Sequence, residues 1–394
     1  MTLVDLEDLA LGEGGHLLVA RGLATSPVIA VRGRDPALAA DLPAWCRSLG
    51  HGLADLQRGA IVTATITRTT ADRWVGAERA GAADPRAPGA IAATPPARWG
   101  LAARGALVEA GAPAFDFPLA DRDAVWTDDA ARLYAAAAAA QWDPATAIPW
   151  DARITHPPEV EDAVVQVMTY LVENETAALL VPARFLAQLH PHFREVMQLL
   201  AIQVADEARH IEVFTRRARL HRDALGTSAA AGQASLHTLV VEPDFATAAF
   251  LLSVLGEGSF LALLHFLRDH APDPITRAVA RLSAQDEARH VAFGLAHLAR
   301  HVGIDPSLRG RLATAVERRH AALAHTTGLN ADVFDALVLL AAGSWAPADL
   351  RRGHAAVVAL AAEMDSGRQA RLARLGFDAS EAAALSSLHT RNFM

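Results

Sequence analysis

The sequence Asp-Glu-Ala-Arg-His occurs twice in this chain, at residues 206–210 and 286–290. A glutamate and a histidine three positions apart lie on one face of an α-helix, where both side chains can bind one metal ion. That pair alone is common, because a chain with 17 Glu and 17 His is expected to contain roughly 0.7 of them by chance. The whole pentapeptide is expected only about 0.005 times. Its repetition predicts two helices that each supply a Glu/His pair to a metal site.

Two further Glu-x-x-His pairs lack the features of this repeat. Glu13 and His16 lie in a glycine-rich turn, and no aspartate precedes Glu317, which pairs with His320. We expect neither pair to bind a metal ion.

The fold class is predicted to be mainly α. Four long segments have apolar residues at helical spacing, and they cover residues 159–189, 193–222, 244–270 and 274–302. Short proline-containing breaks join the first segment to the second and the third to the fourth, while a longer polar stretch joins the two pairs. This order predicts a four-helix bundle with one long crossover. A further helix is expected at 128–140, and extra helices are expected from residue 308 to the C-terminus.

A site for two metal ions also needs one carboxylate from each of the other two helices. In an antiparallel helix hairpin, residues at equal distances from the turn face each other. Glu175 and Glu207 have their midpoint in the first proline break, at residue 191, and Glu257 and Glu287 have theirs in the second, at residue 272. Glu175 and Glu257 are therefore predicted to complete the site. The alternative to a metal ligand at Glu257 is a buried carboxyl group whose hydrogen bonds are made with other protein groups.

Glu173 competes with Glu175 for the first of these positions. The helix face through Glu175 is otherwise apolar, whereas the face through Glu173 also carries Asp162 and Gln166. This periodicity predicts that Glu175 points into the bundle and that Glu173 is solvated.

The predicted ligands are four carboxylates and two imidazoles: Glu175, Glu207, His210, Glu257, Glu287 and His290. Their four negative charges balance two divalent cations, and a set rich in oxygen donors favours Fe or Mn, as Fe/Fe, Mn/Mn or mixed Mn/Fe. Two such ions can together bind and reduce dioxygen. The composition excludes a Schiff-base or PLP lysine and a cysteine-ligated iron–sulfur cluster, because the chain has no lysine and only one cysteine. No separate organic-cofactor motif is identified.

These residues resemble the ferritin-like superfamily of di-iron carboxylate proteins, over about residues 126–302. The doubled pentapeptide is similar to that of the hydroxylase subunits of bacterial multicomponent monooxygenases. The resemblance implies that Asp206 orients His290, that Asp286 orients His210, and that Arg209 and Arg289 anchor the two aspartates. Small subunits of ribonucleotide reductase share the scaffold but carry a radical tyrosine four residues after the first histidine. Phe214 stands there in this chain, and Tyr170 is a poor substitute, which disfavours a radical generator.

Four other residues near the predicted ligands have two interpretations each. Gly256 and Gly258 flank Glu257, where they allow either close helix packing or space and local unwinding beside the metals. His265 and His297 lie about two helical turns after Glu257 and His290. Each is interpreted either as a histidine of the core or as a contact for the substrate.

Residues 1–75 are predicted to form a small α/β unit, with strands near 27–32 and 60–67 and a helix over 35–50. The segment from Asp35 through Cys46 to His51 resembles the second half of TusA-like sulfur carriers. The reactive Cys-Pro-x-Pro motif of that family is missing, so docking or dimerisation is favoured over sulfur transfer. Residues 76–125 are predicted to be a Gly/Pro/Ala-rich linker or surface wrap, and 126–394 to be the di-iron domain with its C-terminal helices.

The function expected from these features is that of a di-iron oxygenase or oxidase, such as a monooxygenase, that hydroxylates, N-oxygenates or desaturates a small organic molecule. A ferroxidase, peroxide scavenger or metal store is the first alternative, and a metal-stabilised interaction module is the second.

The expected partners are O2, the substrate and an electron-donating reductase, and we expect a cytoplasmic homodimer. The formal charge of −8 argues against nucleic acid. Residues 245–267 are long enough to span a membrane, but Glu257 at their centre argues against it.

Overall fold

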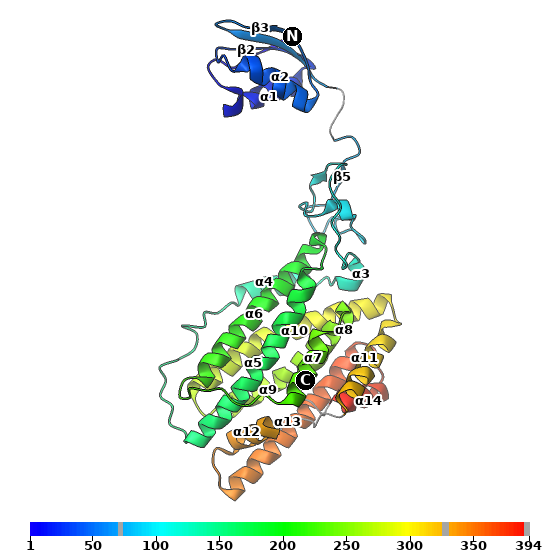
Figure 1. Cartoon of the computed structure of the whole chain (residues 1–394). Coiled ribbons are helices and arrows are strands. Elements are labelled where there is room, and N and C mark those ends of the chain that lie inside the picture. Colours follow the sequence, from blue (N-terminus) through cyan, green and yellow to red (C-terminus); the bar gives the residue numbers. More distant parts are fainter. Residues whose placement is uncertain (70–73, 325–330, 390–394) are drawn as a thin grey trace. The chain divides into compact units, whose positions relative to one another are not determined.

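The computed structural model describes residues 1–69, 74–324 and 331–389. The chain divides into two compact units (Figure 1). Residues 1–79 and 107–112 make the first unit, and residues 80–106 and 113–394 make the second.

The first unit contains a four-stranded sheet in the order β1-β2-β4-β3. Strands β1 and β2 are parallel, and the other neighbours are antiparallel. The strands are β1 (Thr2–Asp5), β2 (Val28–Gly33), β3 (Gly52–Gln57) and β4 (Val62–Thr67), and the helical elements are η1 (Leu11–Glu13), α1 (Gly15–Thr25) and α2 (Leu38–Leu49). A separate two-stranded ladder pairs β5 (Glu78–Arg79) with β6 (Leu107–Val108). Strands β1 and β3 were not predicted; both lie at the edges of the sheet, and each contains an aspartate.

Cys46 belongs to the apolar core of this unit, where it is packed with residues of the sheet and of α2. Burial raises the pKa of its thiol to about 11. A thiol is nucleophilic as the thiolate, so Cys46 is held in its unreactive form at neutral pH. The resemblance to sulfur carriers stays a prediction.

The second unit is helical, as predicted. Its main helices are α5 (Pro158–Leu186), α6 (Arg194–Ala218), α8 (Phe245–Ala249), α9 (Gly258–Asp269) and α10 (Pro274–Ile304). Helix α5 packs along α6, and α9 packs along α10, which also contacts α6 (Figure 1). The π-helix η4 (Phe250–Glu257) joins α8 to α9, so the third helix of the bundle is continuous but locally widened.

Shorter elements surround this bundle. They are η2 (Ala97–Trp99), α3 (Arg122–Val125), α4 (Ala130–Ala139), η3 (Pro191–Phe193), α7 (Ala230–Val240), α11 (Leu308–Leu323), α12 (Ala331–Ala342), α13 (Pro347–Arg374) and α14 (Ala379–His389). The crossover between α6 and α8 contains α7, where the sequence predicted only a polar connection. Helix α12 packs on α5, and α13 packs on α9 and α12.

The helix face through Glu173 is more covered than its polar sequence predicted. Tyr170 is only 8% exposed and Thr169 is buried, while Glu173 itself is half-buried. Helices α7 and α12 pack on α5, which accounts for this cover. The periodicity of a helix predicts which of its faces is polar, but it does not predict which later helices pack on that face.

The apolar segment from Phe245 to Asp269 is long and apolar enough to cross a membrane, as is one bent pair of C-terminal helices taken together. In the structure, 83% of the most apolar window of Phe245–Asp269 is buried within the protein. This segment forms the third helix of the bundle, and such a core helix satisfies the same criteria of length and composition.

Arg217 connects three helices at one end of the bundle. Its Nη1 and Nη2 donate to the two carboxylate oxygens of Glu161 on α5, at 2.7 and 2.9 Å. Nη2 also donates to Asp273 at 2.7 Å, and Nε donates to Thr276 of α10 at 2.8 Å. All four side chains are buried. A buried and fully paired guanidinium therefore holds the register of α6 against α5 and ties α6 to the start of α10.

Candidate metal centre

The structure brings the six predicted ligands together in the middle of the bundle. Two groups of four side chains each present ligand atoms that lie within 4.8 Å of one another. The first group is Glu175, Glu207, His210 and Glu287, and the second is Glu207, Glu257, Glu287 and His290. Two glutamates belong to both groups, so each group has two shared carboxylates, one carboxylate of its own and one histidine. This arrangement makes a site for two neighbouring metal ions.

The ligand atoms themselves show that the side chains fit such ions. All six residues are at most 4% exposed. The buried atoms that lack a hydrogen bond are Oε1 of Glu175, Oε1 of Glu207, Oε2 of Glu257, both carboxylate oxygens of Glu287, and Nδ1 of His290. Nδ1 of His290 and Oε1 of Glu207 nevertheless lie 2.9 Å apart as an ion pair, and the Glu175 and Glu287 oxygens lie 3.3–3.5 Å from histidine Nδ1 atoms. Buried polar atoms are rarely left without a partner, and several carboxylate oxygens without donors would be costly. Two cations between the carboxylates would satisfy all of these atoms.

The close approach of these ionisable groups shifts their pKa values. Burial, followed by repulsion from Glu207 and Glu287, raises the pKa of Glu175, and burial together with Glu287 raises that of Glu257. Burial alone would lower the pKa of His210 and His290, but the surrounding carboxylates outweigh it and raise both. Without cations these side chains therefore hold protons, and metal ions would have to displace them on binding.

Each histidine is oriented by the aspartate of the opposite pentapeptide. Nε2 of His210 lies 3.2 Å from Oδ2 of Asp286, and Nε2 of His290 lies 3.3 Å from Oδ2 of Asp206. An ionised carboxylate has no proton to donate and can only accept hydrogen bonds, so Nε2 of each ring carries a proton. Nδ1 faces the glutamates, where its lone pair can bind a metal ion once that ion displaces the second proton of the ring. The contacts implied by the resemblance are present in the structure.

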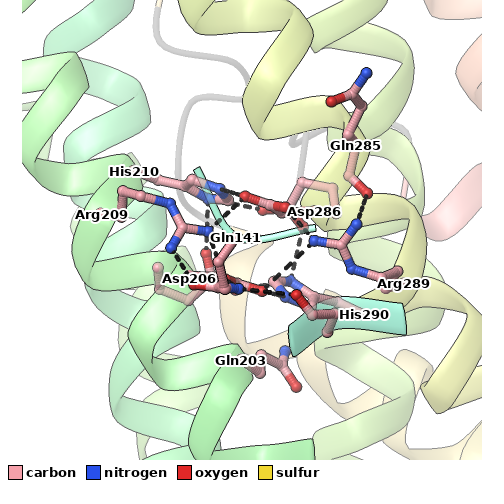
Figure 2. A network of polar contacts seen from close by, with 12 residues as sticks. Gln141, Gln203, Asp206, Arg209, His210, Gln285, Asp286, Arg289 and His290 are labelled. Carbon is pink, nitrogen blue, oxygen red and sulfur yellow. Dashed lines mark hydrogen bonds and ion pairs between the residues drawn. The ribbon is translucent and has the colours of Figure 1, made fainter. Parts of the chain in front are cut away.

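Arg209 and Arg289 hold these two aspartates (Figure 2). Nη2 of Arg209 donates to Asp206 at 2.5 Å and to Asp286 at 2.8 Å, and Arg289 donates to Asp286. Burial would raise the pKa of Asp286, but the hydrogen bond with His210 and the neighbouring charges lower it. Asp286 is therefore held as a carboxylate, the form that orients the imidazole.

Two residues of this network were not predicted from the sequence. Gln141 donates to Asp206 at 2.8 Å and accepts from Arg209 at 2.5 Å. The indole nitrogen of Trp142 donates to Asp286 at 2.8 Å, and the indole ring lies 4.6 Å from the guanidinium carbon of Arg209 and 6.5 Å, centroid to centroid, from the ring of His210. Both residues follow directly on α4, outside the bundle segments. The sequence Gln-Trp-Asp-Pro indicates a turn and carries no signal for a contact with a residue more than 60 positions later.

We expect Asp286→Asn to weaken metal binding by about 10- to 100-fold, the usual effect of losing a partner that orients a metal-bound histidine. Asparagine has a similar shape but no charge, so it holds the Nε2–H of His210 less firmly and disturbs Trp142 and both arginines. The measurement is competition with a chelator of known affinity. Glu212→Gln is the matched control, because Glu212 is exposed on α6 two residues after His210. An unchanged affinity in Asp286→Asn would contradict the orienting role.

Glu257 differs from the other ligands in its backbone and its neighbours. It is the last residue of the π-helix η4, and its Oε1 accepts from Nε2 of Gln203 at 3.0 Å. A Cβ on Gly258 would lie 2.3 Å from Nε of Arg371, so this glycine is required for the close approach of an arginine side chain. The flanking glycines were expected to allow either close helix packing or local unwinding. The structure shows close packing at Gly258, and the π-helix that precedes this residue is locally widened.

His297 is a core histidine in this structure. It is completely buried beside the rings of Phe245, Phe293 and His301, and among the described residues the backbone of Trp126 is the one hydrogen-bonding group that acts on its ring. Burial lowers its pKa to about 3. His265, the other histidine with two interpretations, is half-buried on α9.

This burial predicts an acid sensitivity that His297→Phe removes. Below about pH 6.5 an unfolded histidine takes up a proton that folded His297 excludes, so stability falls as the pH falls, by at most ~1.4 kcal/mol per pH unit. We expect the unfolding free energy of the wild type to drop by about 2 kcal/mol more than that of His297→Phe between pH 6.5 and pH 5. Urea denaturation at both pH values measures this. The exposed His237, replaced by Gln, is the control, and parallel pH profiles for wild type and His297→Phe would refute the prediction.

Three other glutamates that the sequence analysis weighed as possible ligands are not part of the metal centre. Glu13, Glu173 and Glu317 belong to neither ligand group among the described residues. Phe214 is buried with its ring centroid 6.2 Å from that of His210, so a phenyl group occupies the position where a radical tyrosine would lie.

Comparison with known proteins finds similarity only at the level of structure. No family model matches the chain, and no curated protein matches it. One similar solved structure is an R2-like ligand-binding oxidase mutant with an aerobically reconstituted Mn/Fe cofactor, at 17% identity and a TM-score of 0.47, and another is a mutant with an Fe/Fe cofactor, at 16% and 0.48. Each match covers 63% of this chain and 94% of the other. With similarity this distant, the function of the centre has to be inferred from its own residues.

Proposed function

We propose that this chain is an O2-dependent oxidoreductase that uses two iron ions, or iron and manganese, to oxidise a small organic substrate. The observation that carries the proposal is the pair of overlapping ligand groups that share Glu207 and Glu287. Four carboxylates and two imidazoles make a hard, oxygen-rich set that suits Fe and Mn better than a structural zinc site. Two such ions, when bound, supply the electrons and the binding position for dioxygen.

The surrounding residues support redox chemistry with an organic substrate. The site is closed off from water, since the ligands and the two orienting aspartates are almost completely buried. Exclusion of water protects reactive species from side reactions. The contacts of Nε2 in His210 and His290 with the two aspartates fix the orientation of both rings, with Nδ1 toward the glutamates, while Oε2 of Glu257 and both oxygens of Glu287 accept no hydrogen bond.

The test is the stoichiometry of oxygen uptake by the reduced, metal-loaded protein. We expect about one O2 to be consumed per pair of ions in a single rapid phase, with further uptake only when a chemical reductant is supplied. No uptake would show that the metals have a structural role and would refute the proposal. Oxidation of many added Fe(II) ions per chain without an organic substrate would instead establish the ferroxidase alternative.

In continued turnover the electrons have to come from elsewhere, and we propose a separate reductase as their source. Replacing the chemical reductant by a reductase fraction from the same cells, with a reduced nicotinamide as donor, tests this step.

A further inference from the structure

Helices α10 and α13 both pack closely on the segment that carries Glu257. Helix α10 contacts η4, and a Cβ on Gly294 of α10 would lie 2.5 Å from the Cβ of Ser253. Helix α13 contacts both η4 and α9, and a Cβ on Gly258 would lie 2.3 Å from Nε of Arg371. A methyl group at either glycine would force its neighbour to move. The π-helix is therefore fitted to α10 and α13 as closely as the backbone allows.

The π form of this segment leaves one backbone carbonyl without an N–H donor. In a π-helix each N–H bonds to the carbonyl five residues earlier, whereas in an α-helix it bonds to the carbonyl four residues earlier. The π-helix ends at Glu257 and α9 begins at Gly258, so the return to the narrower spacing passes over one carbonyl among residues 254–256. A buried carbonyl without a donor is costly. The π form therefore needs a donor from a side chain at this position.

Arg371 supplies a donor there. Its Nε donates to the carbonyl oxygen of Val254 at 2.6 Å. The hydroxyl of Ser259 donates to the next carbonyl, that of Leu255, at 2.7 Å. In a continuous α-helix the Val254 carbonyl would accept from the N–H of Gly258, and the arginine would not be required. The hydrogen bond from Arg371 thus favours the π form of the segment over its α form.

The form of η4 also decides which neighbours its side chains can reach. Glu257, its last residue, belongs to the second ligand group of the metal centre, and its Oε1 accepts from Gln203 of α6 at 3.0 Å. A change to the α form would shift the register by about one residue, which rotates one end of the segment against the other by roughly 100°. The contact of Ser253 with Gly294 and that of Glu257 with Gln203 are therefore compatible only in the π form.

We propose that Arg371 is a positioning residue, which holds η4 in the π form through the Val254 carbonyl and thereby keeps Glu257 in the second ligand group. The inference rests on the metal centre of the proposed function. It adds a role for α13, a helix outside the four-helix bundle, in the position of a metal ligand. Arg371 acts here through the N–H of its Nε, so the donor matters more than the charge.

Two substitutions separate the hydrogen bond of Arg371 from its charge. Arg371→Met keeps an unbranched side chain that is as long as arginine up to Nε, but it has no donor. Arg371→Gln is also uncharged, yet it places an N–H donor at the same distance along the side chain as Nε. Arg374→Met is the matched control, since Arg374 is exposed on α13 one turn later.

The first measurement is a titration of the chelator-treated full chain with Mn(II), in which the EPR signal of the free ion is followed. The wild type and Arg374→Met should bind two ions, one for each ligand group. In Arg371→Met the first ion should bind normally and the second about tenfold more weakly, because a partner that orients a ligand is lost. Arg371→Gln should restore the second ion to within about threefold of the wild type, since a neutral donor replaces a charged one. An unchanged Arg371→Met, or equal losses in both variants, would overturn the inference.

The second measurement separates this inference from the proposed function, because it uses metal-free protein. Amide hydrogen exchange over residues 250–258 should be about tenfold faster in Arg371→Met than in the wild type, and it should recover in Arg371→Gln. Peptides from α5 should exchange at the same rate in all variants, which excludes a general loss of stability. This result would support the role of Arg371 even if the wild type consumed no O2. Equal exchange of residues 250–258 in all variants would contradict that role.

Gly258→Ala disturbs the same contact from the other side and keeps the test valid if Arg371→Met does not fold. The added methyl group would displace Nε of Arg371, so the second ion should again bind about tenfold more weakly. In the Arg371→Met background the same change should have little further effect, because the methionine has no hydrogen bond to lose. Fully additive losses from the two substitutions would count against the proposal.

Discussion

Replacing Glu257 or His290 by alanine is expected to reduce the metal content from two ions per chain to one or none. Both residues belong to the group Glu207, Glu257, Glu287 and His290, and neither belongs to the other group. Each substitution therefore removes one of four donors from a single ion. Losing a residue that only orients a ligand weakens metal binding 10- to 100-fold, so losing a direct ligand should weaken it by more than 100-fold. Metal analysis after gel filtration measures the effect.

The control for this prediction is Glu317→Ala. Glu317 forms the same Glu-x-x-His spacing with His320, but it is exposed on α11 and belongs to neither ligand group. This variant should keep two ions per chain. Equal metal content in Glu257→Ala, His290→Ala and wild type would show that these residues are not ligands. Loss of metal from Glu317→Ala would show that the analysis reports general instability.

Arg217→Gln is expected to destabilise the second unit by about 3–5 kcal/mol. The substitution leaves the carboxylates of Glu161 and Asp273 buried close together without their shared cation, and it removes the link to Thr276. Breaking a buried ion pair is far more harmful than never having formed it, because an uncompensated charge stays inside. The measurement is the free energy of unfolding in urea.

Arg219→Gln provides the comparison for Arg217. Arg219 is exposed at the end of the same helix, so its substitution should change stability by no more than about 0.5 kcal/mol. A loss of less than ~1 kcal/mol in Arg217→Gln would mean that water reaches this end of the bundle and that the hairpin register is held by apolar packing instead. In contrast, Arg371→Gln removes a charge that has no carboxylate partner among the described residues, so it should be much less harmful.

The ligand set could be predicted from the sequence because helix geometry is regular. Glu207 and His210 lie on one helix face by spacing alone, and equal distances from a proline break place Glu175 opposite Glu207. The orienting aspartates followed from the resemblance, and the structure shows both contacts. Whether these side chains bind metal stays a prediction until it is measured.

Contacts between segments far apart in the sequence could not be predicted in this way. Trp142 reaches Asp286 across 144 positions, and no periodicity connects them. The cover over Tyr170 depends on where α7 and α12 pack. Gly258 shows the same limit, since its role depends on Arg371, more than 100 residues later.

The most direct test of the dinuclear centre is element-specific metal analysis of the full chain after expression with abundant iron and manganese. Two ligand groups that share two carboxylates predict close to two Fe or Mn ions per chain. The metal-loaded protein should lose its ions as the pH is lowered, because protons compete with metal ions for the ligand atoms, and the two shared carboxylates should couple the loss of one ion to that of the other. Zinc as the only metal, or no metal at all in the folded protein, would contradict the account.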